Sequence, residues 1–204
     1  MQAKPEQRVL HPAVQAHDRD ARIVAALERL SEVVRNLAWD AGSAAGLSPL
    51  HVQLLAFLHG HGESDVHAVE LTAWFHLSKA TVSVALRTLE EKGLLRMRKA
   101  AGDARAKVIA LTTKGRAEAA KCAAHLDPLH ALLRDLSHDQ RDRLYASLFA
   151  LTVEARRAGL VRVERMCVTC AHYGTRAGKP FCALLNKRLL PQEHRMDCPE
   201  HKAA

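Results

Sequence analysis

The sequence has few aromatic residues and no long apolar segment. Aromatic side chains are only 4% of the 204 residues, although 48% of the residues are hydrophobic, so leucine, alanine and valine must build the core. No apolar run approaches the roughly 18 residues that a membrane-spanning helix needs. The N-terminal segment also lacks the apolar stretch of a secretory signal. We therefore expect a cytoplasmic protein without a membrane partner, large enough for one domain and an appendage.

Sequence motifs typical of enzymes are missing as well. The chain has no glycine-rich phosphate loop, no His-Glu-x-x-His metalloprotease motif and no Gly-x-Ser-x-Gly nucleophile motif. Glu90 and Glu91 are adjacent, so on a helix they point in different directions and look like solvated charges instead of an acid/base pair. We therefore expect a protein that is not an enzyme.

What the chain has in excess is positive charge. Its formal net charge is +8, which favours a polyanionic partner such as nucleic acid. The excess is concentrated in one segment, where only Glu90, Glu91 and Asp103 oppose it. The basic residues there are Arg87, Lys92, Arg96, Arg98, Lys99, Arg105, Lys107, Lys114 and Arg116. Each of them, taken singly, also fits an ordinary solvated surface.

The spacing of apolar residues predicts a mainly helical protein. Residues 1–18 have prolines at 5 and 12 and no periodicity, so we expect a flexible arm. Apolar residues three and four apart from Ile23 to Ala41 predict a long amphipathic helix that ends at Gly42–Gly46. Further helices are expected from Pro49 to Gly60 or Gly62, over 66–76, from Ser78 to Gly93, over 113–125, from an Asp127 cap, and from a Ser137 capping box to about Arg157.

A helix-turn-helix and a hairpin stand out within this pattern. The third and fourth helices are separated by only a couple of residues around Leu77, which is typical of a helix-turn-helix. After Gly93 the period changes, because Leu95 and Met97 alternate with basic residues. The returning strand contains Val108 and Leu111, and "AAGDAR" predicts the tip between the strands. A hairpin directly after the second helix of such a motif is the wing of a winged helix.

At the motif level, "LSKATVSVALRTLEEKGLLRMRKAAGDARAKVIALTTKG" resembles the multiple antibiotic resistance regulator (MarR) family. It has the "LEEKGLL" helix exit, the Asp103-x-Arg105 wing tip, and the "LT-x-x-G" of Leu111, Thr112 and Gly115 that closes the wing. The resemblance covers about residues 20–158. It implies a winged helix-turn-helix whose terminal helices interlock in a homodimer on double-stranded DNA, with recognition helices about 34 Å apart. The alternative is that the terminal helices pack within one subunit.

The resemblance also implies which residues contact DNA. In relatives the wing-tip arginine enters the minor groove and an aspartate positions it, which matches Arg105 and Asp103. Many relatives have a long polar residue in place of Val84, so base reading should lean on its neighbours. The exposed face of the fourth helix, by helical geometry, presents Lys79, Ala80, Thr81, Ser83, Val84, Arg87 and Thr88. Arg98 and Lys99 of the wing are further candidates for DNA contact.

Four of the five cysteines lie near the C-terminus, in "CVTC" (Cys167 and Cys170), "FCALL" (Cys182) and "DCPEH" (Cys198). Cytoplasmic thiols stay reduced, so this cluster indicates metal or redox chemistry before disulfides. The Cys-x-x-Cys pair and two further thiolates can complete the tetrahedral shell of a structural zinc site. They can equally hold a [4Fe–4S] cluster, and the sequence leaves Zn²⁺ and the cluster as open alternatives. A metal-free dithiol of Cys167 and Cys170 is the third interpretation.

The same segment is similar to small cysteine modules that in some cases carry [4Fe–4S] clusters in radical-enzyme subunits. That similarity implies that Tyr173, Phe181 and Leu184 shield a cluster from water. His172, His194 and His201 lie close by in the sequence and are candidates to replace one thiolate or to donate hydrogen bonds to sulfur. The fifth cysteine, Cys122, stands alone in a helical sequence and is expected to be a buried small hydrophobe.

The sequence therefore predicts a mainly α-helical protein with a small β-wing, in three parts: an arm over 1–18, a winged-helix and dimerisation domain over 19–158, and a Cys-rich metal-binding module over 159–204. The expected function is a dimeric transcriptional regulator, a repressor that responds to redox state, metal or a small ligand. The alternative is a redox or electron-transfer accessory protein whose winged helix binds another protein. His125, His130 and His138 are candidates to line a pocket for a small-molecule effector, with surface or core roles as the alternative.

Overall fold

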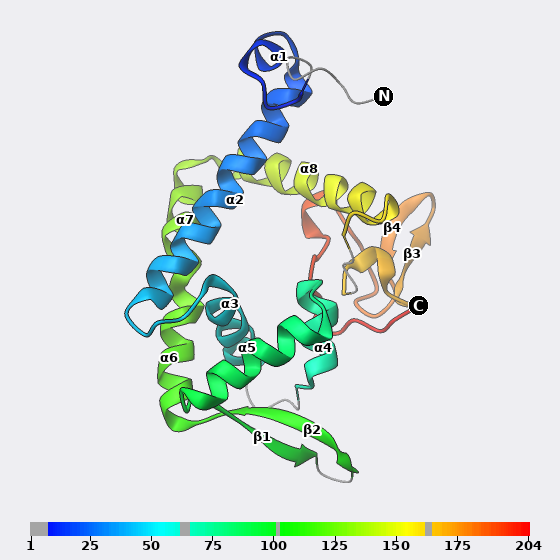
Figure 1. Cartoon of the computed structure of the whole chain (residues 1–204). Coiled ribbons are helices and arrows are strands. Elements are labelled where there is room, and N and C mark those ends of the chain that lie inside the picture. The colour runs from blue at the N-terminus through cyan, green and yellow to red at the C-terminus, as the bar shows by residue number, and fades with distance from the viewer. Residues whose placement is uncertain (1–7, 62–65, 101–102, 162–164) are drawn as a thin grey trace, which may run out of the picture.

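The computed structural model describes residues 8–61, 66–100, 103–161 and 165–204, and of residues 99–100 and 103–107 it describes the backbone only. Pro5, Gly62 and the two tip residues of the wing lie outside the described residues. The fold is mainly helical with a two-stranded wing, which confirms the predicted fold class (Figure 1). A second, three-stranded sheet near the C-terminus was not predicted.

The N-terminal part contains one short and one long helix. Residues 12–17, predicted to belong to an irregular arm, form helix α1 (Pro12–His17), which begins with a proline in its first turn. Helix α2 (Arg19–Ser43) follows. It begins at Arg19 because the Asp18 side chain caps it, accepting hydrogen bonds from the backbone N–H groups of Asp20 and Ala21. The long amphipathic helix predicted from the apolar spacing is therefore confirmed. Figure 1 shows α2 rising away from the winged part of the molecule.

The helix-turn-helix is formed by α4 (Ala68–Phe75) and α5 (Lys79–Glu91), behind α3 (Pro49–Gly60). His76 has a left-handed backbone with φ 54°, which allows the tight turn between α4 and α5. Ser48 and Ser78 cap α3 and α5 as predicted. Helix α4 begins two residues later than predicted, because Val66 pairs with the wing and accepts a hydrogen bond from the Ile109 N–H group at 2.9 Å.

The core lies between α2, α3, α5, α6 (Thr113–Ala123) and the base of the wing. The predicted inner face of α5, formed by Val82, Ala85, Leu86 and Leu89, is buried in it. Its other largest fully buried side chains are Val52, Leu54, Leu55, Leu71, Leu95 and Cys122. Cys122 thus has the core position predicted for it, and burial raises the pKa of its thiol to about 11.

The wing consists of β1 (Leu95–Ala100) and β2 (Asp103–Leu111), paired antiparallel from Leu95 opposite Leu111 outward. Helix α6 (Thr113–Ala123) then packs against α3. Gly115 lies so close to the chain before the wing that a Cβ atom on it would stand 1.6 Å from the Leu94 carbonyl oxygen. The same carbonyl accepts a hydrogen bond from the Thr112 N–H group at 3.1 Å. This close approach is the physical reason for the "LT-x-x-G" motif.

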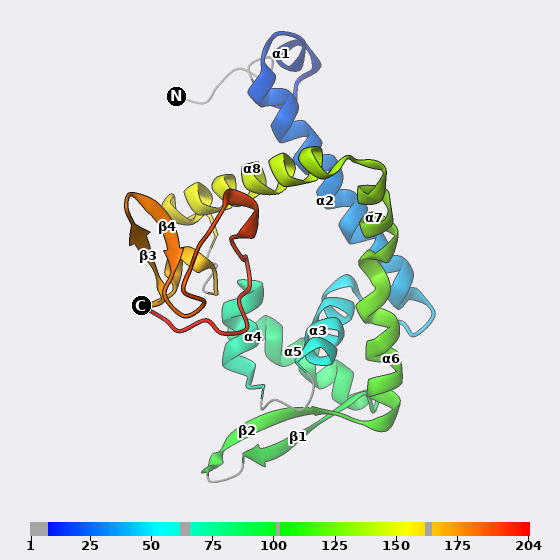
Figure 2. The same cartoon turned by 180° about the vertical axis from the view of Figure 1, so that it is seen from behind.

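The last helices lead away from the winged part. Helix α7 (Asp127–Leu132) has Leu126 as its cap residue, so Asp127 is in the first turn and is not the predicted cap. Helix α8 (His138–Arg157) begins with the predicted Ser137–Gln140 capping box. In Figures 1 and 2 the C-terminal end of α8 leads to the sheet of β3 (Tyr173–Arg176), β4 (Lys179–Cys182) and β5 (Lys187–Arg188).

One histidine of the fold gives a testable pH dependence. The Ser48 N–H group donates to Nδ1 of His51 at 3.1 Å, which requires an unprotonated nitrogen. Burial, and next the charge of Lys92, lower the pKa of His51 below its ordinary value of 6.5. The unfolded chain therefore binds more protons at His51, and the folded state loses stability as the pH falls below 6.5.

We expect urea unfolding to give a smaller stability for the wild type at about pH 5.5 than at about pH 7.5. In His51→Gln this loss should be smaller, because glutamine can still complete the capping box and does not titrate. Equal losses in the two proteins would contradict the role given to His51.

Candidate nucleic-acid interface and a cysteine-lined pocket

Helix α5 presents a polar face to solvent. Of the residues predicted to read DNA bases, Lys79, Thr81, Ser83, Val84 and Arg87 are exposed, and Val84 keeps 64% of its surface. Thr88 is only half-buried, and its hydroxyl donates to the Val84 carbonyl at 3.1 Å. The Thr81 hydroxyl lies 2.9 Å from that of Ser78 in the helix cap. Lys79, Ser83 and Arg87 therefore carry the polar groups that reach furthest into solvent.

The wing stands beside this face. Arg96 and Arg98 are exposed on β1, whereas Leu95 is buried and Met97 half-buried, as the predicted alternation requires. Strand β2 begins at Asp103, so Asp103 and Arg105 belong to the strand and not to the predicted six-residue tip. The side chains of Lys99, Asp103 and Arg105 lie outside the described residues.

A groove of about 480 Å³ runs between α4, α5 and β1. Its polar lining comes mainly from α5, through Lys79, Ser83 and Arg87, with Glu90 at one end. Glu90 also accepts a hydrogen bond from the Met97 N–H group at 3.2 Å, which ties α5 to the first strand of the wing. Glu90 is exposed, as the sequence interpretation of a solvated charge expects, and this hydrogen bond to the wing is an additional contact.

Three of the basic residues that were counted toward the polyanion surface also donate hydrogen bonds to backbone carbonyl groups of the protein. The Lys92 ammonium donates to the Ala45 carbonyl at 3.1 Å, and the Lys114 ammonium donates to the Lys92 carbonyl at 2.9 Å. The Arg116 guanidinium donates to the Leu111 carbonyl at 3.1 Å. These cations hold the ends of neighbouring elements together. These contacts leave the three charges in place, and the exposed cations Lys79, Arg87, Arg96 and Arg98 lie on α5 and the wing.

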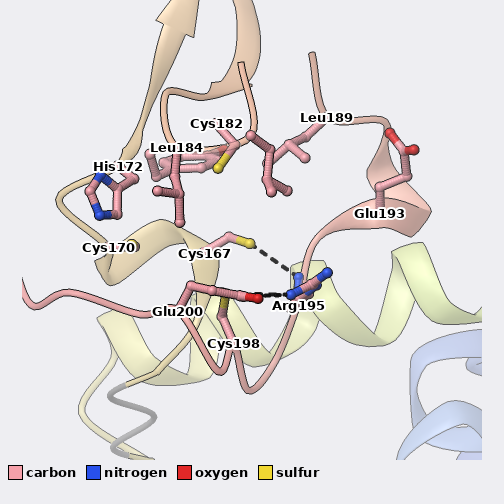
Figure 3. Close-up of a pocket in the computed structure, with 12 residues that line it drawn as sticks. Cys167, Cys170, His172, Cys182, Leu184, Leu189, Glu193, Arg195, Cys198 and Glu200 are labelled. Carbon is pink, nitrogen blue, oxygen red and sulfur yellow. Dashed lines mark hydrogen bonds and ion pairs between the residues drawn. The ribbon is translucent and has the colours of Figure 1, made fainter. Parts of the chain in front are cut away.

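All four C-terminal cysteines line one pocket, as Figure 3 shows. Cys167 begins the 3-10 turn η4 (Cys167–Thr169), Cys170 follows that turn, and Cys182 ends β4 opposite Tyr173. Cys198 joins them because the last segment pairs with the region around η4: the Cys198 N–H group donates to the Arg165 carbonyl at 3.0 Å, and the Ala171 N–H group to the Lys202 carbonyl at 2.7 Å. The four residues therefore lie together, and the metal centre predicted for them stays a prediction.

Hydrogen-bond donors surround the sulfur atoms. The Arg195 backbone N–H group donates to Cys167 Sγ at 3.2 Å, and the Arg195 guanidinium lies 3.8 Å from Cys198 Sγ. Burial raises the pKa of Cys167, the Arg195 hydrogen bond lowers it, and the three neighbouring cysteines raise it again. As the side chains lie, no three His, Cys, Asp or Glu residues in the described part of the chain are arranged to hold a single metal ion.

The histidines near the pocket have different positions. His172 lines it together with Tyr173 and Leu184, which the sequence named as shielding residues. His201 Nε2 lies 3.0 Å from the Thr169 hydroxyl. His194 is buried and connects the cysteine segment to α8: its carbonyl accepts from the Tyr145 hydroxyl at 2.6 Å, and its ring lies 4.9 Å from that of Phe149.

Of the proposed effector-pocket histidines, two make local contacts. His125 Nδ1 lies 2.7 Å from the Cys122 carbonyl oxygen, and His138 Nδ1 lies 3.3 Å from the Arg141 guanidinium. An effector pocket with His125, His130 and His138 stays a prediction.

Known proteins have the same arrangement of helices and wing. A sequence model of the MarR family matches residues 45–106, which run from the start of the α3 region into β2. The crystal structure of a MepR–DNA complex from S. aureus has a TM-score of 0.58 at 22% identity, and the match covers 64% of this chain and 96% of that one. The fold is a MarR-type winged helix.

Two further structures agree with this assignment of the MarR-type fold. A crystal structure of MarR has a TM-score of 0.55 at 24% identity, over 69% of this chain and 95% of that one. A MarR family transcriptional regulator from Rhodococcus sp. RHA1 has a TM-score of 0.54 at 20% identity, over 66% and 96%. About a third of this chain therefore has no counterpart in these MarR-type structures. Among curated protein sequences, none is significantly similar to the chain.

The helices that flank the MarR-type core leave apolar side chains in solvent. On α8, Leu144, Leu148 and Leu151 form a stripe at spacings of four and three, and Leu151 keeps 49% of its surface. On α2 the exposed large apolar residues are Ile23, Val24, Leu30, Val33 and Trp39. Of the helices in the described ranges, none combines the length and the hydrophobicity that crossing a bilayer requires.

Proposed function

We propose that this chain is a DNA-binding transcription regulator that acts as a homodimer on a two-fold symmetric operator. The observation that carries the proposal is the exposed polar face of α5, with Lys79, Ser83 and Arg87, beside a basic wing. The MarR-type fold supports it, as does the presence of a MepR–DNA complex among the similar structures.

In the proposed complex α5 enters the major groove, which is wide enough to admit a helix. Arg87 can donate two hydrogen bonds to one guanine, and Val84 can pack against a thymine methyl group. Arg96 and Arg98 of the wing then lie close to the phosphate backbone, where each neutralised phosphate releases counterions. Arg105, at the start of β2, is proposed to enter the adjacent minor groove, with Asp103 as its positioning residue.

The exposed apolar stripes on α2 and α8 are proposed to form the dimer interface. In a two-fold dimer each side chain contributes twice, so a short stripe buries a large apolar area. Two copies would present two α5 helices to successive major grooves, which requires half-sites about 34 Å apart. The proposal takes repression as the regulatory outcome, because a dimer that covers a promoter excludes other proteins from it.

A response to a signal is proposed to act through α8. Tyr145 and Phe149 on one face of α8 contact His194 of the cysteine segment, and the adjacent face carries the Leu144–Leu151 stripe. A change in the cysteine segment therefore reaches the proposed dimer interface through one helix. Such coupling requires that the signal bind two arrangements of α8 with different affinity.

The substitution Arg87→Ala tests the proposed contact between α5 and DNA. Arg87 is exposed and forms no ion pair within the described residues, so the change should leave the fold intact. Loss of a bidentate base contact costs about 1–3 kcal/mol, so we expect affinity for the operator to fall by roughly 5- to 150-fold. Fluorescence anisotropy with a labelled operator duplex measures this.

The matched control is Lys121→Ala, which removes a cation from α6 that pairs with Glu118. That variant should bind within about twofold of the wild type at about 0.15 M salt, where distant charges are screened. Equal losses of affinity for Arg87→Ala and Lys121→Ala would mean that only the net charge matters, and they would contradict the placement of α5 on the DNA.

Arg105→Ala tests the wing. It should lower the affinity for the operator and reduce the slope of affinity against salt concentration by about one if the wing contacts phosphate or the minor groove.

A further inference from the structure

Residues 165–204 have too small an apolar core to hold their structure by packing alone. Only Met166, Leu189 and His194 are buried in this fully described segment. Segments of about 40 residues generally need disulfides, a metal or a partner to fold. The segment nevertheless has a three-stranded sheet, and an antiparallel β-bridge joins Cys170 to Ala203 near the C-terminus. A cross-link at the centre of the segment would explain how it keeps this structure.

The four cysteines stand where such a cross-link is needed. They come from η4, the end of β4 and the C-terminal segment, which are the separate pieces of the fold. Figure 3 shows the side chains of Cys167, Cys182 and Cys198 in the middle of the pocket. One group bound by all four thiols would tie each piece to the others. The fifth cysteine, Cys122, is in the core of the winged part and takes no part in the pocket.

We propose that this pocket binds a metal centre through the thiolates of Cys167, Cys170, Cys182 and Cys198. This metal binding goes beyond the proposed function, and metal analysis tests it without DNA. Each thiol loses its proton on binding, so four protons are released. The Arg195 N–H group at 3.2 Å from Cys167 Sγ and its guanidinium near Cys198 are the donors that stabilise metal-bound sulfur. Leu184, Leu185 and Leu189 line the pocket and limit the access of water to it.

Soft thiolate donors suit both a single Zn²⁺ and a [4Fe–4S] cluster. Four sulfur atoms on one zinc lie about 2.3 Å from a common point. Within the described residues no three ligand groups are arranged in that way, although all four cysteines line the same pocket. Either centre uses the same four thiolates, and metal analysis distinguishes one zinc ion from an iron–sulfur cluster.

The test is metal analysis of the full-length chain, purified without a histidine tag and without oxygen. Zinc, iron and acid-labile sulfide are measured per chain, together with the visible spectrum. About four iron and four sulfide per chain, with absorbance near 400 nm from iron–thiolate charge transfer, would identify the centre as a [4Fe–4S] cluster. One zinc per chain in a colourless protein would keep the four-thiolate centre and exclude the cluster. Neither metal would overturn the proposal and leave a metal-free dithiol.

Three variants locate the centre. Cys182→Ala should lose at least about nine-tenths of the bound metal, because three thiolates leave the shell open. Cys122→Ala is the matched control and should keep the wild-type metal content, since Cys122 is outside the pocket. His172→Ala should also keep it, and loss of metal in His172→Ala would contradict a shell made of four thiolates. Far-ultraviolet circular dichroism checks that the helices remain folded in each variant.

Discussion

Gly115→Ala should destabilise the protein by about 3 kcal/mol and lower its melting temperature by roughly 10 °C. The new methyl group would stand 1.6 Å from the Leu94 carbonyl oxygen, so α6 and the base of the wing must separate. That carbonyl cannot simply turn away, because it accepts the hydrogen bond of the Thr112 N–H group, and the Thr112 hydroxyl donates to the neighbouring Gly93 carbonyl at 2.7 Å. The loss is measured by urea unfolding and by thermal scanning of the full-length protein.

The control for this substitution is Gly60→Ala. Gly60 is the last residue of α3, and a Cβ atom there would meet nothing within 4 Å. Alanine at that position should be neutral or should add up to about 1 kcal/mol, because it lowers the backbone entropy of the unfolded chain. If both glycine variants have wild-type stability, the close packing of α6 against Leu94 is not present in solution.

Leu151→Lys should dissociate the dimer and, with it, abolish tight binding to the operator. Leu151 keeps 49% of its surface in the single chain and stands on the same stripe as Leu144 and Leu148. In a two-fold interface the change removes two leucines and adds two desolvated charges, which costs at least about 3 kcal/mol. The dimer dissociation constant should then rise by roughly a hundredfold or more.

Analytical ultracentrifugation over a range of protein concentrations measures this dissociation. Leu160→Lys is the control, because Leu160 follows α8, is 82% exposed and does not belong to the stripe. A dimer of unchanged affinity in Leu151→Lys would remove the α8 stripe from the interface. A wild-type chain that is monomeric at all concentrations would remove the homodimer altogether.

Local signals in the sequence predicted most of the winged part. Ser48, Ser78 and Ser137 are cap residues whose hydrogen-bond partners lie three residues away, so the helix starts could be read directly. The alternation of Leu95 and Met97 with arginines likewise marks a strand with one buried side. The tight turn at Leu77 was predicted because only a couple of residues separate the apolar patterns of α4 and α5.

Features that depend on distant partners were not predicted. Val66 joins the wing through Ile109, which is more than forty residues later in the chain, so its local sequence looked helical. The carbonyl partners of Lys92 and Lys114 were not predicted, because they belong to other elements. The hydrogen bond that Glu90 accepts from the Met97 N–H group was not predicted for the same reason.

The cysteine segment was predicted only in part. The spacing of Cys167, Cys170, Cys182 and Cys198 indicated a common site, and the four residues do line one pocket. The β3–β4–β5 sheet that brings them together carries no alternation of buried and exposed residues, because each of its residues is either exposed or half-buried. Its strands are short and its core is too small to leave a sequence pattern.

The most direct test of the central claim is selection of DNA by the purified full-length protein. A library of random duplexes is incubated with the protein at about 0.15 M salt, and the retained duplexes are sequenced over several rounds. We expect enrichment of an inverted repeat whose half-sites are centred about 10 base pairs apart, or one helical turn, as a two-fold dimer with two α5 helices requires. Retention of duplexes without any enriched sequence, or no retention at all, would contradict the assignment of this chain as a sequence-specific regulator.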